Sequence, residues 1–238
     1  MPLPSVILPG YLARGTDYRW LEKTLNERGI PTVTVPLRKR DWLPTIGGRS
    51  VVPILRQIDR TIATVRENSK SETVNLIGHS AGGWIARIYL GDRPYDVRGD
   101  VTEKAAIWQG RKVVSRLITL GTPHISQERW TKRNLDFVQN SYPGAFYPEI
   151  QYICVAGKAV YGQRWQSWLA YNSYQITCGT GECWGDGITP VSAAHLKGAM
   201  NLTLEGVWHS PNSPGRWYGS PEVVEMWVQY LLETSGAT

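Results

Sequence analysis

The chain has 238 residues, 42% of them hydrophobic and 19% charged, so it can bury a sizeable core within a single α/β domain. Its formal charge of +6 is not gathered into a long Lys/Arg run or a nucleic-acid-binding motif, which argues against a nucleic-acid partner. No stretch approaches the roughly 18 consecutive apolar residues that a membrane-spanning helix needs.

The N-terminus has no basic segment, longer apolar segment or cleavage site of a secretory signal, so we expect a cytoplasmic protein. Its three cysteines are too few for a disulfide framework and lack the CxxC spacing of a zinc site. Two interpretations of Cys178 and Cys183 remain: a disulfide within their loop, or two reduced thiols. We expect no metal and no cofactor.

Six short apolar runs alternate with helical patterns along the chain. They cover residues 4–10, 31–37, 73–79, 114–121, 150–157 and 201–206. Most are apolar almost throughout, which indicates strands buried on both faces, as in a parallel sheet covered by helices.

Between these runs, Thr16 or Asp17 is expected to cap a first helix and Ser50 a second, and Ser220 followed by Pro221 is expected to open the last. The alternation predicts one domain over 1–238, a doubly wound, mostly parallel sheet of six strands with helices on both faces. Residues 122–149 and 158–200 break the pattern, being long, aromatic and rich in turns. Both follow strands, so we expect them either to form a small substrate-binding cap or to fold onto the body as plain loops.

The stretch TVNLIGHSAGGWIARIYL, residues 73–90, begins as a buried strand and ends as a helix. Its GHSAG motif is typical of a nucleophile elbow, where a sharp strand-to-helix turn presents a serine in a strained conformation. Gly78 and Gly82 would avoid collisions between the strand and the helix. Gly83 lies outside the rule, and we expect its small size to admit a neighbouring loop, such as the one bearing Tyr11. The alternative role for Ser80 is a capping serine in a tight turn.

A nucleophilic serine needs a histidine base and a carboxylate that orients it. Among four histidines, His209 best suits the base, because it follows the last expected strand and the chain order Ser, Asp, His places it last. Asp186, in WGDGITP, best suits the acid. Glu182 is its nearest competitor, and a plain turn aspartate is the other interpretation of Asp186.

Two backbone N–H groups would complete the site by holding an oxyanion. One belongs to Ala81, directly after the serine. The other belongs to Tyr11 in the loop LPGYLARG, where Gly10 would let the chain turn.

The motifs LPGY, GHSAGG, LGTPH, GDGITP and VWHS, in this order, resemble the lipase and esterase branch of the α/β-hydrolase fold over nearly the whole chain. VPLRKRDWLPTIGGRS with LIGHSAGGWIARIYLG resembles a lipase-like group of cyanobacteria and plant plastids. The resemblance implies Ser80 as nucleophile, Asp186 as acid, His209 as base, and Tyr11 and Ala81 as oxyanion donors. Two features depart from it, since Pro9 stands where many lipases have histidine, and the fold's first two strands are lacking.

The segment LRKRDW follows the second expected strand and should border the site. Its Arg38, Lys39, Arg40 and Trp42 are candidates for binding an anionic head group or an anionic membrane, although a charge run is more often a solvated face. His124, in GTPH, is expected either to line the pocket or to fix its loop by a hydrogen bond.

Together these patterns predict a serine hydrolase that cleaves carboxylic esters, of lipids or other acyl groups, through an acyl-enzyme. The same three side chains could instead transfer the acyl group to another acceptor or cleave a thioester. A non-catalytic module that binds a protein or a membrane surface is the remaining alternative.

Overall fold

A six-stranded parallel sheet forms the centre of the computed structural model, which describes residues 2–97 and 107–232. The strand order is β2-β1-β3-β4-β5-β8, and every neighbouring pair is parallel. The strands are β1 Ser5–Leu8, β2 Thr32–Thr34, β3 Val74–His79, β4 Val114–Leu120, β5 Gln151–Lys158 and β8 Met200–Glu205. The predicted doubly wound sheet is confirmed.

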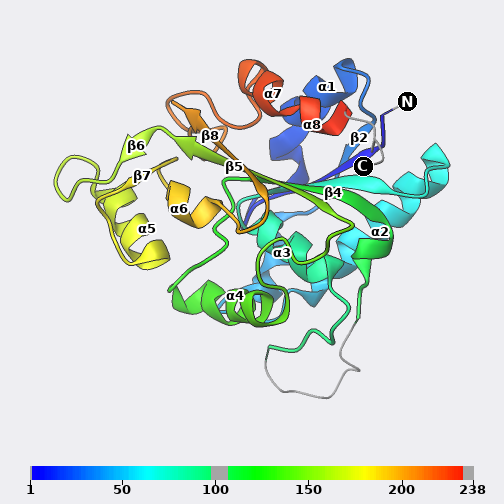
Figure 1. The fold of residues 1–238 in the computed structure, drawn as a ribbon, viewed down its shortest axis with the longest axis horizontal. Helices are drawn as coiled ribbons and strands as arrows, with labels where there is room; N and C mark the ends of the chain where they lie inside the picture. The colour runs from blue at the N-terminus through cyan, green and yellow to red at the C-terminus, as the bar shows by residue number, and fades with distance from the viewer. Residues whose placement is uncertain (1, 98–106, 233–238) are drawn as a thin grey trace.

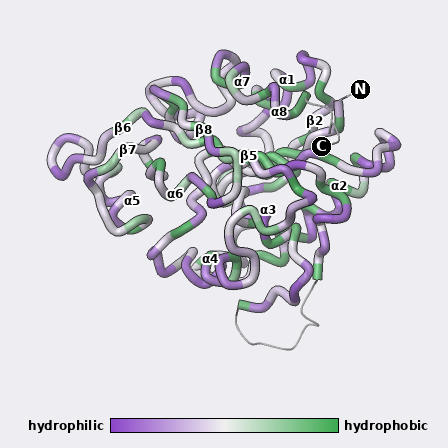
Figure 2. Tube along the Cα trace, viewed as in Figure 1, coloured by the Kyte–Doolittle hydropathy of each residue, from purple (hydrophilic) through white to green (hydrophobic). Residues whose placement is uncertain are grey.

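Helices cover both faces of this sheet (Figure 1). On one face lie α1 Arg19–Glu27, α7 Pro221–Trp227 and α8 Gln229–Leu232; on the other lie α2 Val52–Ser69, α3 Ala81–Leu90 and α4 Arg129–Ser141. Side chains alternate between the faces, so Val6 and Leu8 of β1 join one buried cluster while Ile7 joins the other. The central strands are accordingly mostly green in Figure 2, with more purple on the outer loops.

A smaller lobe extends beyond β5 and β8 (Figure 1). It contains the antiparallel pair β6 Val160–Tyr161 and β7 Trp184–Gly185, together with α5 Trp168–Cys178 and α6 Val191–Ala194. In the part of the chain that the structure describes, no helix is long and apolar enough to cross a membrane. Cys178 and Cys183 are unbonded, and both Sγ atoms lie near the Thr180 carbonyl oxygen, at 3.4 and 3.6 Å.

The helix starts differ in part from the predicted caps. A 3-10 turn, η1 Gly15–Tyr18, precedes α1, whose N-cap is Tyr18. Asp17 accepts the Arg14 backbone N–H at 2.9 Å, so its carboxylate caps the 3-10 turn instead of the α-helix. Ser220 is the N-cap residue of α7, but its hydroxyl makes no capping hydrogen bond and instead accepts the Trp217 N–H at 3.0 Å.

The second helix also begins one residue later than predicted. Val51 is the N-cap of α2, and the Ser50 hydroxyl accepts the Val52 N–H at 3.3 Å. The second strand, β2, is shorter than the expected run of residues 31–37 and ends at Thr34. Pro36 has no N–H with which to continue the hydrogen bonding to a neighbouring strand.

The strand order reverses between β1 and β3, because the chain runs outward from β1 to β2 and then returns to β3 on the other side. Open α/β sheets bind ligands outside the carboxyl ends of the strands at such a switch point. Tyr11 follows β1 and Ser80 follows β3, so both lie at this position.

Candidate active site

Ser80 occupies the turn between β3 and α3 with φ 51° and ψ −126°. A non-glycine residue in such a sparsely populated region costs of order 1–3 kcal/mol and persists only where its surroundings hold it. The strained elbow expected from GHSAG is therefore present, and it is part of a packed scaffold.

The three glycines around Ser80 admit three different neighbours. A Cβ on Gly78 would lie 2.6 Å from the Gly83 nitrogen, and one on Gly82 would lie 2.9 Å from the Pro9 carbonyl oxygen. A Cβ on Gly83 would lie 2.8 Å from the Thr122 Cβ. The expectation that Gly83 admits the Tyr11 loop is therefore wrong, because Gly82 contacts that loop and Gly83 contacts the loop after β4.

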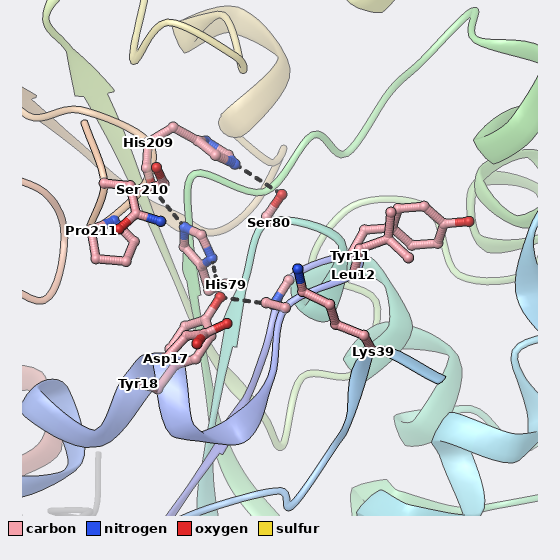
Figure 3. A pocket seen from close by; sticks show the side chains of 13 residues that line it. Tyr11, Leu12, Asp17, Tyr18, Lys39, His79, Ser80, His209, Ser210 and Pro211 are labelled. Atoms are coloured by element: carbon pink, nitrogen blue, oxygen red, sulfur yellow. Dashed lines mark hydrogen bonds between the residues drawn. The ribbon is translucent and has the colours of Figure 1, made fainter. Parts of the chain in front are cut away.

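Ser80, His209 and Asp186 are joined by hydrogen bonds in series, although 129 residues separate the serine from the histidine. His209 Nε2 lies 3.0 Å from Ser80 Oγ (Figure 3), and His209 Nδ1 lies 2.7 Å from Asp186 Oδ2. A carboxylate only accepts, so Nδ1 carries the proton toward Asp186 and Nε2 is left to accept the serine O–H. This is the tautomer that a serine nucleophile requires of its base.

Asp186 is 1% exposed and is surrounded by donors. Its Oδ1 accepts the N–H groups of Ile188 and Thr189, at 3.0 and 2.7 Å, and its Oδ2 accepts the Tyr218 hydroxyl at 2.7 Å. Burial by itself would raise the pKa of this carboxyl, but His209 and these donors outweigh it and hold the pKa of Asp186 below its ordinary value. The group therefore stays an anion at neutral pH.

The rival candidates lie apart from this chain of hydrogen bonds. Glu182 is exposed, and His195 Nε2 lies 3.1 Å from Thr203 Oγ1. His124 is buried and lines neither pocket beside Ser80. Gln139 donates to its carbonyl oxygen at 2.6 Å, so His124 belongs to the bonding that fixes its loop.

The two expected oxyanion donors flank the serine. Ala81 is the first residue of α3, and the first N–H groups of a helix have no partner within it. Tyr11 lies in a turn closed by the Ala13 N–H on the Gly10 carbonyl oxygen at 3.1 Å. A Cβ on Gly10 would be 3.0 Å from the Ser80 Cβ, so this turn lies directly against the serine.

Two pockets open on either side of Ser80. One is a cavity of about 270 Å³ on the His209 side. Its lining includes Gly10, Tyr11, Lys39, His209, Ser210 and Asn212. The other, of about 280 Å³, lies between α3, α4 and α5 and is lined by residues from both segments expected to form a cap. Its lining includes Ala81, Trp84, Glu128, Thr131, Ile176 and Ile188.

The basic segment LRKRDW is divided among several places. Lys39 borders the pocket on the His209 side, and its side chain extends from the helix η2 Lys39–Thr45 toward Ser80 (Figure 3). Arg38 lines a separate hollow, and Arg40 is exposed and lines neither pocket beside Ser80.

The expectation that Trp42 binds the substrate is wrong, because its side chain is fully buried. Its indole N–H donates to the Ala13 carbonyl oxygen at 3.0 Å, and its ring packs edge-on against Tyr11 at 5.3 Å between centroids. Trp42 therefore supports the turn that bears Tyr11.

Two contributors escaped the sequence analysis. Tyr218 binds the acid, and Thr122 Oγ1 donates to the Ser80 carbonyl oxygen at 2.8 Å. Thr122 belongs to the LGTPH motif, which indicated that this loop is part of the fold but did not indicate the hydrogen bond from Thr122 to Ser80. No pattern around Tyr218 pointed to Asp186.

Comparison with known proteins agrees with this architecture. No protein-family model matches the sequence, and no curated protein is similar enough to match it. Among solved structures, a truncated carbohydrate esterase from gut microbiota is similar with a TM-score of 0.58 at 11% identity, over 97% of this chain and 85% of that one. The product of the Listeria innocua gene lin2722 is similar with a TM-score of 0.53 at 11% identity, over 100% and 96%.

Aspergillus fumigatus lipase B is similar with a TM-score of 0.50 at 14% identity, over 85% of this chain. The chain spans only 44% of that lipase. At these identities the likeness defines the fold alone. The chain has the α/β-hydrolase fold, with a mostly parallel sheet of six strands.

Proposed function

We propose that this protein is a serine hydrolase that cleaves carboxylic esters of lipids or other acyl groups. The observation that carries the proposal is the continuous hydrogen bonding from Ser80 through His209 to Asp186 at a strained elbow. Nucleophile, base and orienting acid in this order are what acyl transfer to serine needs.

In the proposed reaction His209 Nε2 takes the Ser80 proton while Oγ attacks the ester carbonyl. The N–H groups of Tyr11 and Ala81 hold the resulting oxyanion. His209 then donates its proton to the departing alcohol oxygen, leaving an acyl group on Ser80. Water, deprotonated by His209, attacks this ester, and the released acid leaves Ser80 protonated again. Throughout, Asp186 stabilises the protonated His209 and keeps its ring oriented.

This mechanism assigns the two pockets to the two halves of the ester. The leaving alcohol must lie within reach of His209 Nε2, so it belongs in the cavity of about 270 Å³ that His209 lines. The acyl group then occupies the cavity of about 280 Å³, a volume near the lower end for ligand pockets. Ile176 and Ile188 line this cavity and are each 50% exposed, which gives it an apolar rim along which a longer chain could extend.

Lys39 gives the leaving-group side a positive charge. We propose that it binds an anionic group on the alcohol, because it lines this cavity and its amino group makes no hydrogen bond or close ion pair with the described residues. Asp17 lines the same cavity and interacts with Lys39 through charge, but its carboxylate is hydrogen-bonded by Arg14, whose Nη2 and Nε lie 2.9 and 3.1 Å away. Alanine at Arg38, Lys39 and Arg40 together should weaken binding to anionic vesicles, and unchanged affinity would reject a membrane role.

Labelling with a fluorophosphonate tests the hydrolase itself. We expect the wild type to label and the Ser80→Ala variant not to label, because the reagent reacts with an activated serine. An unlabelled wild type, or equal labelling of the variant, would contradict the proposal. Rates on esters of graded acyl length then test the substrate class, and equal rates for acetyl and long acyl esters would exclude a preference for lipid esters.

A further inference from the structure

The buried side chain of His79 has no part in the proposed reaction, although it directly precedes Ser80. It is 4% exposed, and both of its ring nitrogens have partners. Nδ1 lies 2.6 Å from the Tyr18 hydroxyl, and Nε2 lies 2.7 Å from the His209 carbonyl oxygen (Figure 3). The residue before the serine is therefore bonded to the main chain of the proposed base.

The partners fix the direction of each hydrogen bond. A carbonyl oxygen only accepts, so His79 Nε2 carries a proton and donates a hydrogen bond to the His209 carbonyl oxygen. A neutral imidazole then has an unprotonated Nδ1, which accepts the Tyr18 O–H. The Tyr18 oxygen in turn accepts the Gly10 backbone N–H at 2.9 Å. One consistent series thus runs from Gly10 through Tyr18 and His79 to His209.

The environment keeps this series in one protonation state. Burial and the neighbouring His209 lower the pKa of His79 to about 3, and burial raises the pKa of Tyr18. Both groups therefore remain neutral while His209 gains and loses its proton. Trp217 and Tyr218 also enclose the His79 ring, at 5.8 and 5.9 Å between centroids.

We infer that His79 and Tyr18 are positioning residues, which tie the loop bearing the oxyanion donor and the loop bearing the base to the end of β3. This inference rests on the proposed hydrolase function. Gly10 directly precedes Tyr11, the expected donor, and the other end of the series is the main chain of His209 itself.

The loop bearing the base is held by an isolated bridge, between Trp208 and Trp217, and by the His209 N–H on the Asp186 carbonyl oxygen at 3.0 Å. None of these contacts reaches the loop after β1, so the buried hydrogen bonds of His79 and Tyr18 give the two loops a common reference.

The need for such an anchor follows from the geometry of catalysis. A misplacement of about 1 Å can cost roughly a hundredfold in rate, because donors and base act only when aligned with the reacting atoms. Substrate binding in the two pockets depends less on this alignment. Loss of the anchor should therefore lower kcat much more than it raises KM.

Tyr18→Phe is the first test, because it keeps the ring and removes only the hydroxyl that links Gly10 to His79. We expect kcat for an ester substrate to fall by roughly tenfold to a hundredfold, with KM within about threefold of wild type. Tyr89→Phe is the matched control. Tyr89 and Tyr18 are each 2% exposed, but the Tyr89 hydroxyl donates to Asp59 at 3.0 Å. Neither Tyr89 nor Asp59 lines a pocket beside Ser80, whereas Tyr18 lines the cavity on the His209 side. Its kcat should stay within about twofold of wild type.

A pair of variants at His79 tests the other link. Glutamine can place an amide N–H where His79 Nε2 lies and so restore the donor to His209, whereas leucine cannot. We expect His79→Gln to recover roughly tenfold in kcat over His79→Leu, with equal near-ultraviolet circular dichroism showing that both are folded. A role in packing alone predicts no such rescue.

The inference is overturned if folded Tyr18→Phe keeps kcat within threefold of wild type, if Tyr89→Phe loses as much, or if the two His79 variants are equal. Fluorophosphonate labelling of the wild type separates this result from failure of the proposed function. A labelled, active wild type with unaffected variants rejects only the positioning role, whereas an unlabelled and inactive wild type rejects both.

Discussion

Replacing Asp186 with asparagine tests the proposed acid with little change in shape. The carboxylate accepts four hydrogen bonds, two at Oδ1 from backbone N–H groups and two at Oδ2, from His209 and Tyr218. An amide offers one oxygen and one nitrogen, so it cannot accept at both positions.

The backbone decides how this amide is oriented. Its NH₂ cannot face the two fixed backbone donors at the Oδ1 position, so it must take the Oδ2 position. There the Tyr218 hydroxyl can turn to accept a hydrogen bond, but His209 can do so only by releasing the proton from Nδ1. The histidine then carries its proton on Nε2, facing Ser80, and cannot act as base. A wrong tautomer of this kind lowers kcat by about 10⁴-fold, which corresponds to about 5 kcal/mol.

The loss of kcat is measured by steady-state hydrolysis of a soluble ester. The control is the equivalent substitution at Glu182, the other carboxylate considered as the acid. Glu182→Gln should leave kcat within about twofold, because Glu182 is exposed and no described contact joins it to His209. Tyr218→Phe should cost much less than Asp186→Asn, because His209 keeps its carboxylate partner. If Asp186→Asn retains kcat within tenfold of wild type, the assigned acid is wrong.

Three further predictions concern stability and specificity. Gly83→Ala should lower the free energy of unfolding in urea by up to about 2 kcal/mol, since crowding against Thr122 costs about 1–3 kcal/mol and the gain in helix propensity returns about 1 kcal/mol. A stabilisation of about 1 kcal/mol, the helix-propensity gain alone, would refute the contact. Because the pKa of Asp186 lies below its ordinary value of 3.8, its stabilisation is present above about pH 3.8 and is lost as the pH falls through the lower folded value. Wild type should therefore lose more stability between pH 5 and pH 2 than Asp186→Asn, and parallel losses would contradict this. Lys39→Met should reduce kcat/KM about fivefold for an ester with an anionic alcohol but not for its neutral analogue, and an equal reduction with Arg40→Met would reject a specific contact.

The positions of the strands and of the elbow along the chain could be predicted because local patterns determine them. Continuous apolar runs mark strands buried on both faces, and β3 and β4 appear almost where their runs place them. Ser80 follows from the GHSAG motif. Asp186 and His209 follow from the chain order Ser, Asp, His and from the rule that the loops at one edge of a parallel sheet meet there.

The contacts that hold these residues could not be predicted, since they join residues far apart in the chain. His79 meets Tyr18 across 61 positions and His209 across 130. A buried tyrosine or histidine has the same sequence signature wherever its hydrogen bonds go. Trp42 was misassigned for this reason, because nothing in LRKRDW shows that its indole turns inward to Ala13.

The elbow glycines show how a local motif acts over a larger region. Each of the three removes a side chain at a different junction, since Gly78 admits α3, Gly82 admits the loop after β1, and Gly83 admits the loop after β4. The loop after β1 carries Tyr11, and the loop after β4 bonds the Ser80 carbonyl oxygen through Thr122. A serine with φ 51° is tolerated only where neighbouring contacts determine its backbone. The close approach that the glycines permit supplies those contacts, so the smallness of this stretch both strains Ser80 and holds it in place.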